Sequence, residues 1–118
     1  MPFRVSRGEI CFLQLPTDPP EKGRRPVIVV SSEARNIRDS ADTVLVIPLS
    51  TSVHKAGNPT HLLLLAGETG LPADSIARAE DITTVRKTQL VPPRAALRTV
   101  SNRRVCELST MVRIAMGC

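Results

Sequence analysis

Aromatic side chains are almost absent from this sequence of 118 residues. It contains Phe3 and Phe12, with no Trp and no Tyr. Modules that bind single-stranded nucleic acid by stacking bases on aromatic rings need several such rings on their surface. The chain can hardly supply them, so any RNA that it binds must be held by arginines, polar groups and the backbone.

Cysteines are also few. Cys11, Cys106 and Cys118 are odd in number and widely separated in the sequence. This pattern argues against a disulfide framework or a zinc site and favours a reducing compartment. We therefore expect free thiols and no bound metal.

Long apolar runs are missing as well. The longest leucine run is Leu62–Leu65, and the first nine residues carry Arg4, Arg7 and Glu9 without the apolar core of a signal peptide. A membrane-spanning helix needs about 20 apolar residues. The sequence therefore predicts no membrane association and a cytoplasmic location.

What the chain does contain is typical of a folded domain. Apolar residues make up 42% and charged residues 23% of the sequence, and the length suits one domain over residues 1–118. The 16 Lys and Arg exceed the 11 Asp and Glu, which gives a net charge of +5. An excess of positive charge favours a polyanionic partner such as nucleic acid or an acidic protein.

Short apolar segments alternate with turn residues along most of the chain. They predict strands over residues 9–15, 24–30, 43–47, 60–65, 75–80 and 82–85. Pro48 is expected to end the third strand, residues 67–74 to form a turn, and residues 75–80 to form a half-exposed strand. Residues 32–40 suggest a loop or a single helical turn. This spacing is typical of a small barrel-like sheet and not of βαβ units.

The C-terminal part follows a helical pattern instead. Val105, Leu108 and Val112 fall on one face of a helix that Ser101 would cap and Gly117 would end. The predicted fold is thus mainly β, with a C-terminal helix that packs against the barrel.

One segment combines positive charge with a buried strand. Arg24, Arg25 and Pro26 lead into the β-branched run Val27–Val30. Pro26 fixes its own backbone and biases Arg25 towards an extended conformation, so the Arg25 side chain is held in one direction. A guanidinium fixed at the entrance of a strand is well placed to hold an anion.

Several motifs, taken in order and spacing, resemble the MazF/PemK family of toxin ribonucleases. The motifs are Arg7-Gly8-Glu9-Ile10, the stretch from Arg25 to Ser31, that from Val46 to Ser52, that from Gly70 to Ser75 and that from Ala79 to Leu90. The resemblance covers nearly the whole chain. It implies an SH3-like small barrel of the CcdB/MazF type with a C-terminal helix, assembled as a homodimer.

The resemblance also implies an activity and its partners. Members of the family cut single-stranded RNA at short sequences without a metal or other cofactor. The ribose 2′-hydroxyl attacks the phosphate and leaves a 2′,3′-cyclic phosphate and a 5′-hydroxyl. The implied substrate is mRNA, with tRNA or rRNA as further candidates, and a cognate MazE-like antitoxin with an acidic flexible tail would neutralise the toxin.

The family's catalytic arginine directly precedes the proline, which makes it Arg25 in this chain. A guanidinium can bridge two phosphate oxygens and stabilise the charge that develops on a phosphorane-like transition state. The alternative is a surface arginine in an ion pair with Asp18 or Glu21. Arg24 is expected to attract RNA only through its charge.

The second catalytic residue of the family is a threonine two positions after the proline of the third strand. This chain has Ser50 at that position, followed by Thr51. A serine can give the same hydrogen bond to phosphate but lacks the methyl group that restricts its rotamer. A gapless comparison favours Ser50 and a one-residue slip favours Thr51, so both remain candidates. Ordinary turn-forming hydroxyls are the alternative.

The remaining candidates would contact RNA. They are Asn36, Lys55, Asp74, Ser75, Arg78, Glu80 and Asp81. Each has an ordinary alternative, such as a turn at Asp74 and Ser75 or a solvated charge at Lys55, and the family often carries glutamine at the position of Asp81. Neither histidine is assigned to catalysis, and His61 is expected to be structural because it begins an apolar strand.

A competing interpretation belongs to another functional class. Toxins related to this family inhibit DNA gyrase without cutting RNA, and they act through the C-terminal helix on a protein target. A basic domain that only holds RNA is a third interpretation, against which the shortage of aromatic residues counts.

Overall fold

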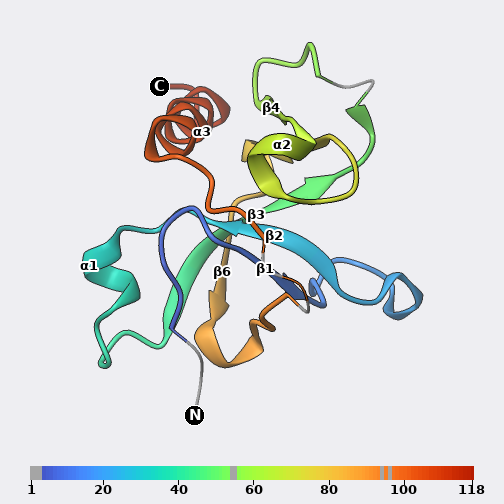
Figure 1. Cartoon of the computed structure of the whole chain (residues 1–118). Coiled ribbons are helices and arrows are strands. Elements are labelled where there is room, and N and C mark those ends of the chain that lie inside the picture. Colours follow the sequence, from blue (N-terminus) through green and yellow to red (C-terminus); the bar gives the residue numbers. More distant parts are fainter. Residues whose placement is uncertain (1–3, 54–55, 94, 96) are drawn as a thin grey trace.

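A curved antiparallel sheet organises the molecule (Figure 1). The computed structural model describes residues 4–53, 56–93, 95 and 97–118. Within these residues the sheet has six strands: β1 (Ile10–Leu13), β2 (Arg25–Val29), β3 (Thr43–Ser50), β4 (His61–Leu64), β5 (Ser75–Arg78) and β6 (Thr83–Arg86). Three α-helices accompany them in the same residues, α1 (Glu33–Asn36), α2 (Ala66–Thr69) and α3 (Asn102–Ala115), together with short 3-10 turns at Pro20–Lys22, Ala79–Asp81 and Lys87–Gln89. The predicted sheet of short strands with a C-terminal helix is confirmed.

The sheet divides along β3. On one side β3 pairs with β2, and on the other its first half pairs with β6 while Leu49 and Ser50 pair with β5. The strand order is β1-β2-β3-β5-β4, with β6 as a branch from β3. This arrangement brings the end of β3 beside the start of β5, where polar residues of the two strands meet.

The prediction that Pro48 ends the third strand is wrong, because β3 continues to Ser50. Proline cannot donate to a strand ladder and is tolerated only where no such bond is needed. The pairing with β6 stops at Val46 and that with β5 starts at Leu49. Pro48 therefore falls in the interval between the two partner strands, and Ser50 remains part of the sheet.

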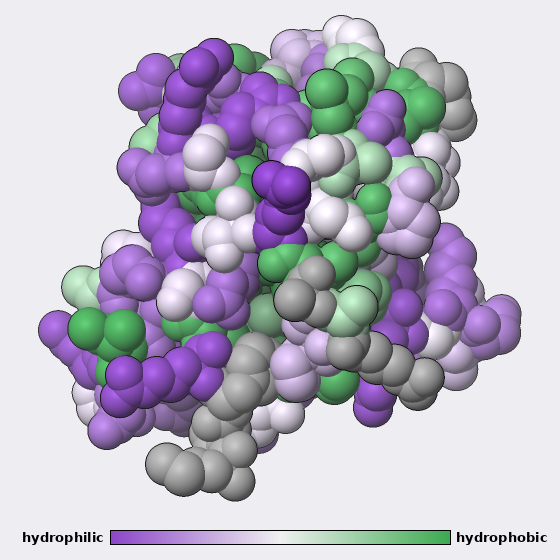
Figure 2. All heavy atoms as spheres, viewed as in Figure 1, coloured by the Kyte–Doolittle hydropathy of each residue, from purple (hydrophilic) through white to green (hydrophobic). Residues whose placement is uncertain are grey.

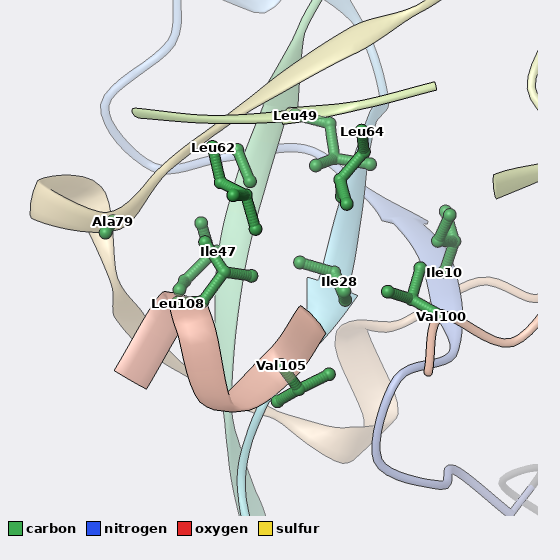
Figure 3. Packing of buried hydrophobic residues seen from close by; sticks show 11 residues of the cluster. Ile10, Ile28, Ile47, Leu49, Leu62, Leu64, Ala79, Val100, Val105 and Leu108 are labelled. Atoms are coloured by element: carbon green, nitrogen blue, oxygen red, sulfur yellow. The ribbon is translucent and has the colours of Figure 1, made fainter. Parts of the chain in front are cut away.

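The β-branched run of β2 is buried on both of its faces. Val27 and Val29 belong to the core inside the barrel, whereas Ile28 points into a second core beneath α3. Figure 3 shows this second core, in which Leu108 of the helix lies beside Ile47 of β3, with Ile28 and Val105 in the same cluster. Since both faces are covered, the sequence is a continuous apolar run without alternation.

The predicted C-terminal helix is confirmed at both ends. The Ser101 hydroxyl accepts a hydrogen bond from the Arg104 N–H, and Gly117, with a φ of 86°, follows the C-cap residue Met116. Val105 and Leu108 are buried against the sheet. The helix thus covers one face of the sheet and leaves the Arg25 end of β2 uncovered (Figure 1).

Two details differ from the sequence-based expectations. The turn predicted over residues 67–74 begins with the helical turn α2. The strand predicted as half-exposed is shorter, and Ser75, Ile76 and Ala77 in it are buried. β5 lies between β3 and β4, so both of its edges are paired, and Ala77 packs into the core that also holds Val105 and Leu108 of α3.

Gly8, in the first of the motifs quoted above, is required by close backbone contact. Its φ is +90°, and a Cβ atom there would lie 2.3 Å from the carbonyl oxygen of Val100. The Gly8 N–H donates to Val29, and the Gly8 carbonyl accepts from Val100. Gly8 therefore joins β2 to the segment that leads into α3.

All three cysteines are free, as predicted. Cys11 is buried, and this burial, with a smaller effect of the Glu9 carboxylate, raises the pKa of its thiol to about 12. Hydrophilic side chains cover much of the face seen in Figure 2. None of the helices in the described part of the chain is long and apolar enough to span a membrane.

Candidate active site

Arg25 is the first residue of β2 and lies where the strand leaves the polar loop of residues 16–23. Its Nη1 lies 3.3 and 3.2 Å from the two carboxylate oxygens of Asp18, and its Nη2 donates to the carbonyl oxygen of Leu49 at 3.2 Å. The ion pair that was the alternative for Arg25 is therefore present. It does not close the site, because 22% of the Arg25 side chain is still exposed.

The exposed part of Arg25 faces a hollow of about 330 Å³. Polar groups dominate its lining, which consists of Lys22, Arg25, Pro26, Leu49, Ser50, Thr51, Ser52 and Ser75. Strand pairing explains the grouping, because Ser50 at the end of β3 pairs with Ile76, the neighbour of Ser75 in β5. Two cationic groups and several hydroxyls thus border the same space, a combination suited to a phosphate group.

Ser50 and Thr51 differ in how firmly they are held. Ser50 is half-buried, and its hydroxyl accepts a hydrogen bond from the Ser52 N–H at 3.2 Å. Thr51 is exposed and follows the end of the strand. Both side chains reach the hollow, so both stay candidates for the second catalytic group, with Ser50 in the better defined position.

Two polar lining residues were not predicted as site residues from the sequence. Lys22 ends the helical turn Pro20–Lys22, and Ser52 follows Thr51. Lys22 lies three residues before Arg25 in the sequence, which could have suggested that the two side chains share a site. Its position in a loop with several other charged residues did not distinguish it from them. Lys22 adds a second positive charge to the hollow.

Arg24 lies apart from this hollow, although it adjoins Arg25 in the sequence. It is exposed and borders a different hollow of about 450 Å³, whose lining is largely apolar and includes Phe12, Leu71 and Val91. Lys55, also predicted to contact RNA, lies outside the described residues.

Asn36 is buried at the end of α1, which follows the opposite end of β2 from Arg25. Its Nδ2 donates to the Ser31 carbonyl at 3.0 Å and to Glu33 at 2.9 Å, and its Oδ1 accepts from the Ser31 hydroxyl at 2.5 Å. The structure therefore uses the Asn36 amide to hold α1 and gives it no place in the hollow.

The candidates around β5 fall into two groups. Ser75 borders the Arg25 hollow, whereas Asp74 is exposed and accepts a hydrogen bond from the Ala66 N–H at the start of α2. At the other end of β5, Arg78 and Asp81 form an ion pair at 3.2 Å. The strand thus separates Arg78 and Asp81 from the hollow.

Glu80 belongs to this second group and is bonded to His61. The Nε2 of His61 lies 2.8 Å from Glu80, and the Thr60 hydroxyl donates to the same carboxylate oxygen at 3.1 Å. Burial alone would raise the pKa of Glu80, but the hydrogen bonds from His61 and Thr60 outweigh it and lower that pKa. His61 is buried, which agrees with its predicted structural role.

Metal ligands do not gather in the part of the chain that the structure describes. No group of three or more His, Cys, Asp or Glu residues there could hold a metal ion. The described site therefore offers a guanidinium, an ammonium and hydroxyls as its chemical groups.

Comparison with known proteins agrees with these observations. Residues 6–116 match the family described as PemK-like, MazF-like toxins of type II toxin-antitoxin systems. The chain is 34% identical over 88 residues to the endoribonuclease MazF6 of Mycobacterium tuberculosis, an overlap that covers 73% of this chain and 76% of that protein.

Solved structures show the same fold. MazF from Deinococcus radiodurans superimposes with a TM-score of 0.73 at 18% identity, covering 98% of this chain and 99% of that one. The MazE-MazF structure from the same organism gives a TM-score of 0.70 at 19% identity and covers 98% of each chain. Because the family match spans nearly the whole sequence and the fold agrees with it, the chain belongs to the PemK-like, MazF-like toxins of type II toxin-antitoxin systems.

Proposed function

We propose that this chain is an endoribonuclease toxin that cuts single-stranded RNA at short sequences without a metal ion. One observation carries the proposal: Arg25 and the hydroxyls of Ser50 and Thr51 border one hollow, in a chain whose relatives are named endoribonucleases. The ribose 2′-hydroxyl would attack the adjacent phosphate, and the products would be a 2′,3′-cyclic phosphate and a 5′-hydroxyl.

Each group in the hollow has a role that its chemistry supports. The Arg25 guanidinium would hold the scissile phosphate and stabilise the charge that grows on its oxygens in the transition state. A hydroxyl of Ser50 or Thr51 would donate a hydrogen bond to the same phosphate. Lys22 would attract the RNA backbone as a more mobile point charge. mRNA is the proposed substrate, with tRNA or rRNA as further candidates, and the cytoplasm is the proposed location.

The proposed assembly is a homodimer that a MazE-like antitoxin neutralises. The MazE-MazF structure of the Deinococcus protein supports such a partner by similarity of fold. An acidic flexible tail would compete with RNA for positive groups such as Arg25 and Lys22. Light scattering at micromolar concentration tests the dimer, because a mass of one chain would contradict it.

The activity is tested with a mixed RNA pool in the presence of EDTA. The wild-type chain should give discrete cuts whose new ends carry a 5′-hydroxyl, and sequencing of these ends maps the cleavage motif. Arg25→Ala serves as the matched control and should leave the RNA intact. Unbroken RNA at high concentrations of wild-type protein would refute the proposal.

The alternative of a gyrase-type inhibitor has one structural observation in its favour. Ile114 and Met116 near the end of α3 are 47% and 73% exposed, as a helix that contacts a protein target would require. A toxic Arg25→Ala variant that cuts no RNA, together with loss of toxicity on changing Ile114 and Met116 to serine, would favour this alternative.

A further inference from the structure

The partner of Arg25 is more buried than Arg25 itself. In the ion pair between them, 10% of the Asp18 side chain is exposed, compared with 22% for Arg25. The carboxylate is thus the inner member of the pair, and the guanidinium is the member that borders the hollow. Asp18 therefore holds Arg25 from the protein side and does not cover it.

The loop fixes the position of this carboxylate. The Asp18 N–H donates to the carbonyl of Leu15 at 3.1 Å, and Leu15 is buried in the barrel core. Pro19 restricts the backbone of the residue before it, which is Asp18. The Gln14 side chain also lies within hydrogen-bonding distance of the Pro19 carbonyl, at 3.4 Å. Asp18 is consequently an anchored group within a loop rich in proline.

A second anchor holds the guanidinium from another strand. The Nη2 of Arg25 donates to the carbonyl of Leu49, the residue directly before Ser50. The same short piece of β3 therefore sets the orientation of the arginine and the place of the candidate hydroxyl. With contacts to Asp18 and Leu49 on two of its nitrogens, the guanidinium cannot rotate without losing a charge-assisted hydrogen bond.

We propose that Asp18 is a positioning residue for Arg25, an inference that rests on the proposed function. A donor that is already oriented stabilises transition-state charge without reorganising during the reaction. The Asp18 carboxylate also offsets part of the Arg25 charge, which weakens the attraction for the phosphate of bound RNA in its ground state. Asp18 thus favours the chemical step at some expense of RNA affinity.

The kinetic test compares Asp18→Ala and Asp18→Asn with Glu21→Gln. Asp18→Ala should lower kcat by about tenfold or more without raising KM, because Arg25 is released while its full charge remains. Asp18→Asn keeps an acceptor oxygen and should lose less. Glu21 is exposed in the same loop, so Glu21→Gln should leave both constants unchanged. Unchanged or increased kcat in both Asp18 variants would overturn the proposal.

A spectroscopic test needs no catalytic activity. Nitrogen NMR of the arginine side chains should show slowed rotation of the Arg25 guanidinium in the wild-type chain, identified by its loss in Arg25→Lys, and faster rotation in Asp18→Ala. Equal rotation in wild type and Asp18→Ala would overturn the proposal even if the RNA is cut. Intact RNA with a slow Arg25 signal that depends on Asp18 would refute the proposed function and retain the positioning contact.

Discussion

Arg25 and Arg104 are equally exposed arginines with different surroundings. Each side chain is 22% exposed, and each contacts a carboxylate and a backbone carbonyl. Arg104 uses all its nitrogens: Nε pairs with Glu68 at 2.9 Å, Nη1 pairs with Glu107, and Nη2 donates to the Leu63 carbonyl at 2.5 Å. These contacts fasten α3 to β4 and α2.

Arg25 has one carboxylate partner, Asp18, and borders a hollow that is lined by the hydroxyls of serine and threonine side chains. Arg104 also borders a hollow, of about 730 Å³, but leucine and methionine side chains form much of that lining. Exposure and charge alone therefore do not single out Arg25 as the candidate catalytic arginine. The number of partners already bound and the chemistry of the adjoining space separate the two roles.

The largest expected effect comes from removing the arginine of the site. Arg25→Ala should lower the rate of RNA cleavage at least about 100-fold, the loss of one strong transition-state donor. Its free energy of unfolding should also fall, by about 1–2 kcal/mol, because the Asp18 carboxylate is only 10% exposed and loses its partner. Initial rates of 5′-hydroxyl formation and urea unfolding measure the two quantities. A variant that unfolds without losing activity per folded molecule would contradict the assigned role.

For Arg104 only stability should change, with cleavage per folded molecule retained. Arg104→Ala should lower the free energy of unfolding by about 2 kcal/mol, between the values for exposed and fully buried ion pairs, because it leaves Glu68 and Glu107 without their partner. Arg103→Ala is the matched control, since Arg103 is 87% exposed and lies 3.8 Å from Glu107. The control should change stability by less than about 0.5 kcal/mol. Similar losses in the two variants, measured by urea unfolding, would remove the distinction.

The hydroxyls of Ser50 and Thr51 test whether the space beside Arg25 contributes single hydrogen bonds to catalysis. Ser50→Ala should reduce cleavage by about tenfold, as expected for one hydrogen bond to a charged group, and Thr51→Ala by less. Ser50→Thr keeps the hydroxyl and should retain activity. Single-turnover cleavage rates measure these effects. A larger loss in Thr51→Ala would transfer the role to Thr51.

The smallest effect concerns Glu80, far from the hollow along β5. The pKa of Glu80 is lowered in the folded protein from its ordinary value of 4.5. The Glu80 carboxylate therefore stabilises the fold at pH values above 4.5, and this stabilisation disappears as the pH falls through the pKa of the folded state. Glu80→Gln should therefore lower the free energy of unfolding above pH 5 by about 0.5 kcal/mol or less, which appears as a slightly lower Tm, and the difference should shrink towards pH 3. Melting curves between pH 3 and pH 7 measure this trend. A constant difference over the whole range would contradict it.

Local sequence patterns predicted much of the fold. The strands, the helix capped by Ser101 and the free thiols follow from short-range preferences and were confirmed. The strand through Pro48 was missed because its tolerance depends on a gap between β6 and β5 that only strand pairing creates. The burial of β5 was missed because the packing of other segments against its faces, such as the core that Ala77 shares with α3, forms only in the tertiary structure.

The candidate site divides in the same way. The motif around Arg25 and the hydroxyls after Pro48 could be selected from the sequence because their local context resembles a family. The sequence could not show that three other candidates, Asn36, Arg78 and Glu80, lie outside the hollow. Their polar groups are bound to Ser31, Asp81 and His61, and these contacts are known only from the folded structure. Lys22 and Ser52 joined the site only when the loops folded over the end of the sheet.

The class of fold, the family and the importance of Arg25, whose backbone Pro26 restricts, could all be inferred from the sequence alone. Those properties rest on local backbone restriction and on motif order, which are present in the unfolded chain. The tertiary structure decided which groups surround Arg25, because Asp18, Leu49 and Ser75 come from three segments that meet only when β2, β3 and β5 are assembled. An electrostatic site depends on such distances, so its chemistry is fixed by packing and not by the order of residues alone.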